Sequence, residues 1–169
     1  MSVTIHEHVL DSTLCAEIYH ATLASLKENK EQWTSNAFWD QGIIKASHPV
    51  LVKQLPEHYK RLVLNTLVEN GILKHLNYHV MQYAWTKLSY IPWHNDDIYS
   101  DAMTIYLNTI WNKDWGGYFL YEDSGNQIRG YIPRFNTAVQ NKNKIAHATT
   151  PVSLDASDVR VTLQIFSGG

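Results

Sequence analysis

The pattern of apolar and polar positions along the chain changes character near residue 78. Before that residue, two stretches carry apolar side chains at the three- and four-residue spacing of an amphipathic helix. The first stretch opens at Asp11, a residue type that caps helices, and continues to about Glu28. The second opens near Pro56 and stops at Gly71. We therefore expect two helices in the N-terminal part of the chain.

A short strand and a hairpin are expected around the first of these helices. Residues 3–10 predict the strand. The hairpin is predicted within residues 31–46, because aromatic residues precede the turn sequence Asp40-Gln41-Gly42 and apolar residues follow it.

From residue 78 onward, short segments rich in β-branched and aromatic residues alternate with turn residues. With the segment YIPWHNDD they make about eight strands, the number that a jelly roll needs. The other segments are HVMQYAWTKLSY, DAMTIYLNTI, GYFLYED, QIRGYI, TAVQN, KIAHATTPV and VRVTLQIF. The expected fold class is mainly β (α+β), a jelly roll with the N-terminal helices packed outside it, where they cover an edge. We expect one domain over 1–169, with 1–77 as helical support and 78–169 as the jelly roll.

Composition narrows the class of partner. Charged residues make up 18% of the chain and the formal net charge is −2, which disfavours nucleic acid as a partner, because surfaces that bind phosphates are usually basic.

No apolar run reaches the ~18 residues of a membrane span, so no membrane association is expected. The N-terminus lacks a basic start followed by an apolar block, and the single cysteine, Cys15, fits a reducing compartment. We therefore expect a cytoplasmic protein without a signal peptide. Nothing in the pattern indicates an oligomeric state.

The segment YIPWHNDD carries the strongest candidate chemistry. On an extended segment, His94 and Asp96 would share a face, which sets a nitrogen ligand beside an oxygen ligand. His147 is the only histidine after His94 and is the natural third ligand. Two histidines and one carboxylate form the facial triad of non-heme Fe(II) oxygenases, which leaves three positions of an octahedron open. The pair alone is a weak signal; the ordered Gly116-Gly117, His147 and Arg160 after it strengthen the prediction.

Other histidines are better explained structurally. His6 and His8 flank Glu7 in a pattern typical of a solvated strand face. His75 and His79 have the four-residue spacing of a helical zinc pair, but they follow the predicted end of the second helix.

Taken in order, WHNDD, MTIYLN, WGGYFLY, HATTPV and VRVTLQIF resemble the Fe(II)/2-oxoglutarate-dependent dioxygenases, specifically the prolyl 4-hydroxylase-like branch. The resemblance covers residues 78 to 166 and implies a double-stranded β-helix with iron at one open end. It implies that His94, Asp96 and His147 bind the iron. Arg160 would pair with the distal carboxylate of 2-oxoglutarate, and Tyr106 would donate a hydrogen bond to the same carboxylate.

The chemistry of Arg160 agrees with this role. A guanidinium presents a planar fork that grips a carboxylate with two hydrogen bonds. Arg160 stands among apolar residues of the last predicted strand, where burial without an anion would be costly. The alternative is that Arg160 lies on the outward face of that strand and is solvated.

The resemblance implies Fe(II), 2-oxoglutarate and O2 as cofactor and co-substrates, with ascorbate as a further reductant. The expected reaction is hydroxylation of a C–H bond in a prolyl residue of a peptide or protein, or in a free amino acid or other small molecule. Halogenation is disfavoured, because related halogenases carry a small residue where this chain has Asp96.

The chain departs from the family in three places. Collagen-type prolyl hydroxylases usually have Lys at the position of Arg160, Pro92 is separated from His94 by Trp93, and the segment DASDV lengthens the stretch before Arg160. None of these removes a predicted ligand.

Two other classes of function stay open at this point. One is a jelly-roll binding module without catalysis, and the other is a cupin-type metal dioxygenase that does not use 2-oxoglutarate. Five aromatic residues near the metal segment either line a substrate mouth or pack inside the barrel: Tyr90, Trp93, Tyr99, Trp111 and Trp115.

Overall fold

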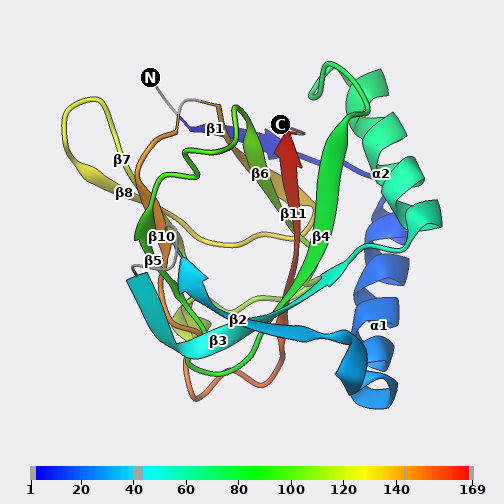
Figure 1. Ribbon diagram of the computed structural model, residues 1–169, viewed down its shortest axis with the longest axis horizontal. Coiled ribbons are helices and arrows are strands. Elements are labelled where there is room, and N and C mark those ends of the chain that lie inside the picture. Colours follow the sequence, from blue (N-terminus) through cyan, green and yellow to red (C-terminus); the bar gives the residue numbers. More distant parts are fainter. Residues whose placement is uncertain (1–2, 40–43, 143, 168–169) are drawn as a thin grey trace.

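Two antiparallel sheets face each other in the computed structural model, and two helices lie against the outer side of the larger sheet (Figure 1). The structure describes residues 3–39, 44–142 and 144–167. The strands and α-helices, in chain order, are β1 (Thr4–Glu7), α1 (Ser12–Glu28), β2 (Thr34–Trp39), β3 (Ile44–Gln54), α2 (Glu57–Glu69), β4 (Tyr78–Trp85), β5 (Ile91–His94), β6 (Ala102–Tyr106), β7 (Phe119–Glu122), β8 (Ile128–Tyr131), β9 (Thr137–Asn141), β10 (His147–Thr149) and β11 (Arg160–Ser167).

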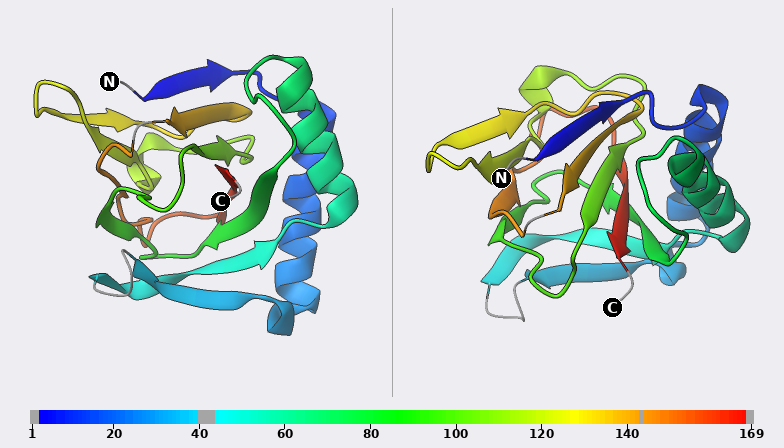
Figure 2. Two further views of the ribbon diagram at one scale, coloured as in Figure 1. Left: turned by 45° about the horizontal axis from the view of Figure 1, so that its top comes forward. Right: turned by 90° about the horizontal axis from the view of Figure 1, so that it is seen from above.

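The jelly roll is confirmed by the strand order. The larger sheet runs β1-β9-β6-β11-β4-β3-β2 and the smaller one runs β5-β10-β7-β8. The eight strands from β4 onward divide equally between the sheets, so the strands predicted after residue 78 are the two walls of the barrel. The β7–β8 hairpin projects on the side away from the helices (Figures 1 and 2).

The N-terminal part contributes strands as well as helices. β1 pairs with β9 at one edge of the larger sheet, and β3 pairs with β4 towards the other. β2 and β3 form the predicted hairpin, whose turn at residues 40–42 lies outside the described residues. The predicted helices are confirmed: Asp11 caps α1 by accepting from the Thr13 and Leu14 amides, and Gly71, with φ of 70°, follows α2.

The alternation of side chains along β11 separates the core from the barrel interior. Val161, Leu163 and Ile165 are fully buried against the helices, in one cluster with residues of α1 and α2. The intervening residues, Arg160, Thr162 and Gln164, are also buried, but they belong to the opposite face, which points into the barrel. One face of β11 therefore packs against the helices, and the other face contributes side chains to the interior of the barrel.

Neither helix in the described part of the chain combines the length and the apolar character that crossing a bilayer requires.

Candidate active site

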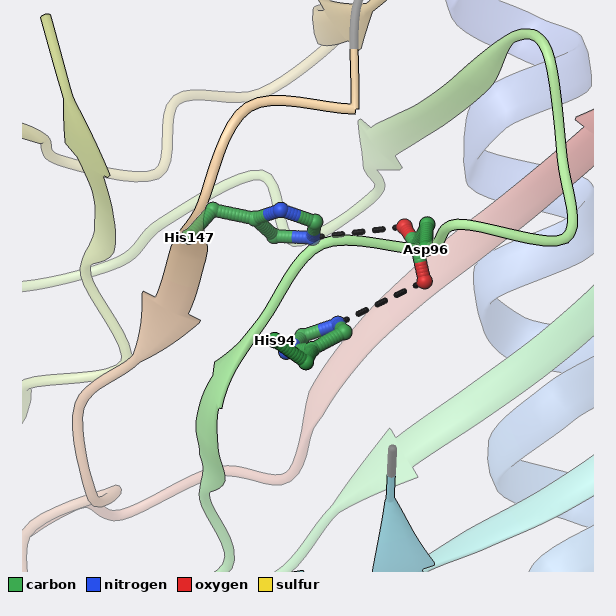
Figure 3. Close-up of side chains that lie close together, drawn as sticks. All are labelled: His94, Asp96 and His147. Carbon is green, nitrogen blue, oxygen red and sulfur yellow. Dashed lines mark ion pairs between the residues drawn. The ribbon is translucent and has the colours of Figure 1, made fainter. Parts of the chain in front are cut away.

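Three side chains predicted as metal ligands converge between the sheets. His94 is the last residue of β5, His147 is the first residue of β10, and the two stand opposite each other in the β5–β10 pair. His94 Nε2 lies 3.5 Å from Asp96 Oδ1, and His147 Nε2 lies 3.3 Å from Asp96 Oδ2 (Figure 3). The ligand atoms of the three residues lie within 4.8 Å of one another, and no second such group occurs in the described ranges.

Asp96 reaches the imidazoles by a turn of the backbone. The prediction that His94 and Asp96 share the face of an extended segment was wrong, because β5 ends at His94 and Asp96 has a left-handed φ of 52°. Aspartate is among the few residue types that adopt this conformation readily. The turn directs the carboxylate toward both imidazole rings, with one oxygen facing each ring (Figure 3).

Both histidines are oriented by backbone carbonyls. His94 Nδ1 lies 2.8 Å from the Pro92 carbonyl, and His147 Nδ1 lies 2.8 Å from the Ile145 carbonyl. A carbonyl only accepts, so each Nδ1 carries its hydrogen, and each Nε2 is the atom that can give a lone pair to a metal. The donor set therefore fits an Fe(II)-type cation: two imidazole nitrogens and a carboxylate, with both imidazole tautomers fixed.

The local charges keep Asp96 ionised. Burial acts to raise the pKa of Asp96, but when the imidazoles are protonated the hydrogen bond from His147 and the charges of His147 and His94 outweigh it and hold the pKa of Asp96 below its ordinary value. A metal ligand must be deprotonated, so this carboxylate is ready to bind a cation.

Arg160 lies deep in the barrel and not on the outward, solvated face. Its side chain is only 1% exposed, with Cζ 4.5 Å from the centroid of the Trp85 ring and 5.1 Å from that of Tyr106. Among the described residues no group meets hydrogen-bond geometry with Arg160 Nε, Arg160 Nη1 or the Tyr106 hydroxyl, although the guanidinium and the hydroxyl are close enough to affect each other's pKa. Burial lowers the pKa of Arg160 and raises the pKa of Tyr106 to about 12, so at neutral pH the guanidinium is charged and the phenol keeps its proton.

Unpartnered buried donors are costly, and the pairing of a guanidinium with a phenol hydroxyl fits an anion. A charge without a partner in the interior is strongly unfavourable, and among the described residues no carboxylate pairs with Arg160. A carboxylate placed beside Arg160 and Tyr106 would accept from the guanidinium and from the Tyr106 hydroxyl. The residues present therefore fit the distal end of a dicarboxylate such as 2-oxoglutarate.

The Gly116-Gly117 pair allows the backbone to pass close to Arg160 and Pro151, as predicted for these glycines. Both glycines have positive φ, 67° and 69°. A Cβ on Gly116 would lie 2.3 Å from the Pro151 carbonyl oxygen, and one on Gly117 would lie 2.9 Å from Arg160 Cδ. The backbone at Gly117 thus forms one wall of the guanidinium pocket, and a side chain there would displace it.

A cavity opens beside the three ligands, and its aromatic walls differ from the five residues suggested by sequence proximity. Trp111 and Trp115 pack edge-to-face on each other, and Tyr99 stacks on Phe166. None of the five lines the cavity. Its aromatic lining consists of Tyr83, Trp85, Phe119 and Phe166. Phe166 lies six residues after Arg160 on the same face of β11, so counting along that strand could have identified it.

Comparison with protein-family models and with curated proteins gives no match. Solved structures do match over nearly the whole chain. A prolyl-4-hydroxylase from Pseudomonas putida superposes with a TM-score of 0.77 at 13% identity, covering 99% of this chain and 92% of that one. The chain has the fold of the prolyl hydroxylases.

The prolyl hydroxylase fold recurs in other matches. A prolyl hydroxylase from Trichoplax adhaerens, in complex with a peptide fragment of the hypoxia inducible factor oxygen degradation domain, gives a TM-score of 0.72 at 16% identity over 97% of this chain and 82% of that one. An oxidoreductase of the 2OG-Fe(II) oxygenase family from Burkholderia pseudomallei gives 0.65 at 14% identity, covering 97% and 84%. The expected double-stranded β-helix is therefore confirmed.

Proposed function

We propose that this protein is an Fe(II)- and 2-oxoglutarate-dependent dioxygenase that hydroxylates a C–H bond. The observation that carries the proposal is the combination of two sites in one barrel. His94, Asp96 and His147 converge as a three-ligand set, and Arg160 with Tyr106 presents buried donors that lack an acceptor.

His94, Asp96 and His147 would hold the cation on one face and leave the opposite face open to co-substrates. When bound, Fe(II) and 2-oxoglutarate supply the activation of O2 that C–H hydroxylation needs. The protein contributes a fixed ligand geometry, because the Nδ1 atoms of both histidines are held by carbonyls and Asp96 is held ionised.

Arg160 and Tyr106 would bind the distal carboxylate of 2-oxoglutarate. The rings of Trp85 and Tyr106 flank the guanidinium and fix its plane, so its hydrogen bonds are aimed before the ligand arrives. All three residues are almost fully buried, and exclusion of water strengthens the attraction between the guanidinium and the carboxylate.

The substrate we propose is a prolyl residue in a peptide or protein, or a free amino acid or small molecule. The aromatic lining of the cavity supports a compact, largely apolar reacting group. One structure with this fold is a complex with a peptide, which supports the peptide alternative. Hydroxylation is favoured over halogenation, because the carboxylate of Asp96 occupies the position that halogenases leave open.

The buried donors distinguish this function from the two alternatives. A non-catalytic jelly roll has no need of a charged guanidinium without a partner in its interior, and a metal dioxygenase that does not use 2-oxoglutarate has no distal carboxylate for it.

The test is O2-dependent formation of succinate from 2-oxoglutarate by the Fe(II)-loaded protein, which needs no knowledge of the substrate. We expect turnover by wild type and its loss in Asp96→Ala, because the carboxylate completes the ligand set. Asp155→Ala, on an exposed loop, is the matched control and should retain turnover. Wild-type-like turnover by Asp96→Ala would show that the carboxylate does not bind the metal.

A further inference from the structure

A hydrogen-bonded side-chain amide forms part of the cavity wall beside the three ligands. Gln164, on β11, is 8% exposed and lines the same cavity as His94 and Asp96. Its Oε1 accepts from the Thr104 hydroxyl at 2.7 Å, and its Nε2 donates to Thr162 Oγ1 at 3.2 Å. The side chain is thus held at a defined place on the wall.

These two bonds use only half of the capacity of the amide. A carboxamide has two N–H donors and two acceptor lone pairs, so one donor and one acceptor of Gln164 remain after the bonds to Thr104 and Thr162. If the positions of Oε1 and Nε2 are exchanged, one donor and one acceptor of Gln164 still remain, because the hydroxyls of Thr104 and Thr162 can each donate or accept. Thr162 Oγ1 also accepts from Trp85 Nε1 at 3.0 Å, which anchors the chain of bonds to the wall of the guanidinium pocket.

Gln164 lies away from the predicted anion site. Arg160 precedes it by four residues on the same face of β11, which corresponds to roughly 13 Å at ~3.3 Å per residue. Gln164 lines the cavity, whereas Arg160, with Cζ 4.5 Å from the centroid of the Trp85 ring, does not. A dicarboxylate that reaches from the metal to Arg160 therefore extends away from Gln164, which remains available to the substrate.

The charge of the cavity restricts what that substrate is. Among the described residues that line it, no lysine or arginine occurs, and Asp96 is the only carboxylate. In the proposed function Asp96 is engaged with the metal. A free amino acid would bring an ammonium and a carboxylate into this space without charged partners, which burial penalises. A peptide group is uncharged and offers one N–H and one C=O, the complement of the unused pair on Gln164.

We propose that Gln164 determines substrate specificity by hydrogen-bonding an amide next to the carbon that is oxidised. The substrate is then a residue flanked by peptide bonds and not a free amino acid. This inference rests on the proposed function, because it takes the three-ligand set as the place of oxidation.

The experiment measures binding without turnover. The protein is loaded with Mn(II) and 2-oxoglutarate, and the NMR lines of probe molecules are followed, because Mn(II) broadens the lines of a probe bound beside it. The probes are blocked tripeptides, acetyl-glycyl-Xaa-glycinamide with each standard residue at Xaa, and the corresponding free amino acids. Affinities for Mn(II) and for 2-oxoglutarate are measured separately in every variant.

We expect at least one blocked tripeptide, and no free amino acid, to be broadened by wild type. Gln164→Met keeps the length of the side chain but removes both hydrogen bonds, and should weaken tripeptide binding about tenfold. Gln164→Glu keeps the shape but cannot donate, and should weaken it similarly. Gln82→Met is the matched control: Gln82 is a buried glutamine on the opposite face of β4, outside the cavity, and should bind as wild type does.

Three results would overturn the inference while leaving the proposed function intact. They are broadening of free amino acids as strong as that of tripeptides, unchanged tripeptide binding in both Gln164 variants, and absence of any tripeptide binding to wild type that holds Mn(II) and 2-oxoglutarate. Failure of wild type to bind Mn(II) or 2-oxoglutarate is a different result and would contradict the proposed function itself.

Discussion

At the scale of single residues, the buried guanidinium of Arg160 is the strongest sign of a bound 2-oxoglutarate. Two of its nitrogens lack a partner although the side chain is almost fully buried, and the neighbouring Tyr106 hydroxyl shares that condition. Such groups are rare in stable proteins and indicate a missing acceptor. If Arg160 lay on the outward face of β11, water would satisfy its donors and they would indicate no ligand.

Arg160→Ala should raise the dissociation constant of 2-oxoglutarate by about 10- to 1000-fold. Charge-assisted hydrogen bonds contribute ~1.5–3 kcal/mol each, and about 1.4 kcal/mol corresponds to a factor of ten. Arg160→Lys should be milder, because Lys keeps the charge but loses the planar fork. Calorimetric titration of 2-oxoglutarate and of Fe(II) measures both affinities, and Fe(II) binding should change little.

Arg129→Ala, at an exposed arginine paired with Asp123, is the control for the Arg160 variants. Unchanged 2-oxoglutarate affinity in Arg160→Ala would place the distal carboxylate elsewhere.

Gly117→Ala should also weaken 2-oxoglutarate binding, although residue 117 has no side chain in the pocket. The added Cβ would lie 2.9 Å from Arg160 Cδ, and alanine disfavours a φ of 69°. The guanidinium must move, and the aimed hydrogen bonds are lost. Gly125→Ala, in the β7–β8 turn, adds the same methyl group where only the Asp123 side chain is near. Equal 2-oxoglutarate affinities of the two variants, measured by titration, would show that Gly117 does not shape the site.

At the scale of elements, spacing along the sequence predicts most of what is observed. The two helices, the hairpin and the eight strands after residue 78 all follow from periodicity and turn residues, because a half-buried element must repeat its apolar positions. The alternation in β11 even separates its two faces. These features are local, so the sequence carries them directly.

The details that periodicity missed are those set by long-range pairing or by one dihedral angle. The cavity aromatics Tyr83 and Phe166 line the same cavity because β4 and β11 are neighbouring strands, although the two residues are far apart in the chain. Proximity in sequence to His94 therefore left open which aromatic residues line the cavity. The left-handed φ of Asp96 is likewise invisible to an alternation rule, which assumes an extended segment.

β11 links the hydrophobic core to the site. A substitution on its core face should therefore change the stability of the whole protein. Leu163, with 0% exposure, packs against the helices, so Leu163→Ala should lower the free energy of unfolding by about 2–5 kcal/mol. Leu154, with 61% exposure, provides the same substitution at the surface, where an effect within about 0.5 kcal/mol is expected. Urea unfolding followed by circular dichroism measures both. A loss at Leu163 no larger than that at Leu154 would mean that β11 is not packed as described.

At the scale of the whole molecule, the fold persists at a sequence identity of 13% to the Pseudomonas putida prolyl-4-hydroxylase. This is physically reasonable, because a jelly roll needs a pattern of alternating strands and not particular side chains. Function requires more than the fold, namely specific groups at specific places. The claim that this molecule is a 2-oxoglutarate-dependent dioxygenase therefore rests on the two sites within the barrel and on whether they are occupied together.

That joint occupancy is tested most directly by anaerobic titration of the purified protein with Fe(II) and then with 2-oxoglutarate, followed by visible absorption. Chelation of protein-bound Fe(II) by 2-oxoglutarate gives a weak charge-transfer band that neither component gives alone. We predict that the band appears in wild type, saturates with one equivalent of Fe(II), and requires both His147 and Arg160 at low 2-oxoglutarate concentration. Binding of Fe(II) by wild type without any band at saturating 2-oxoglutarate would contradict the proposed function.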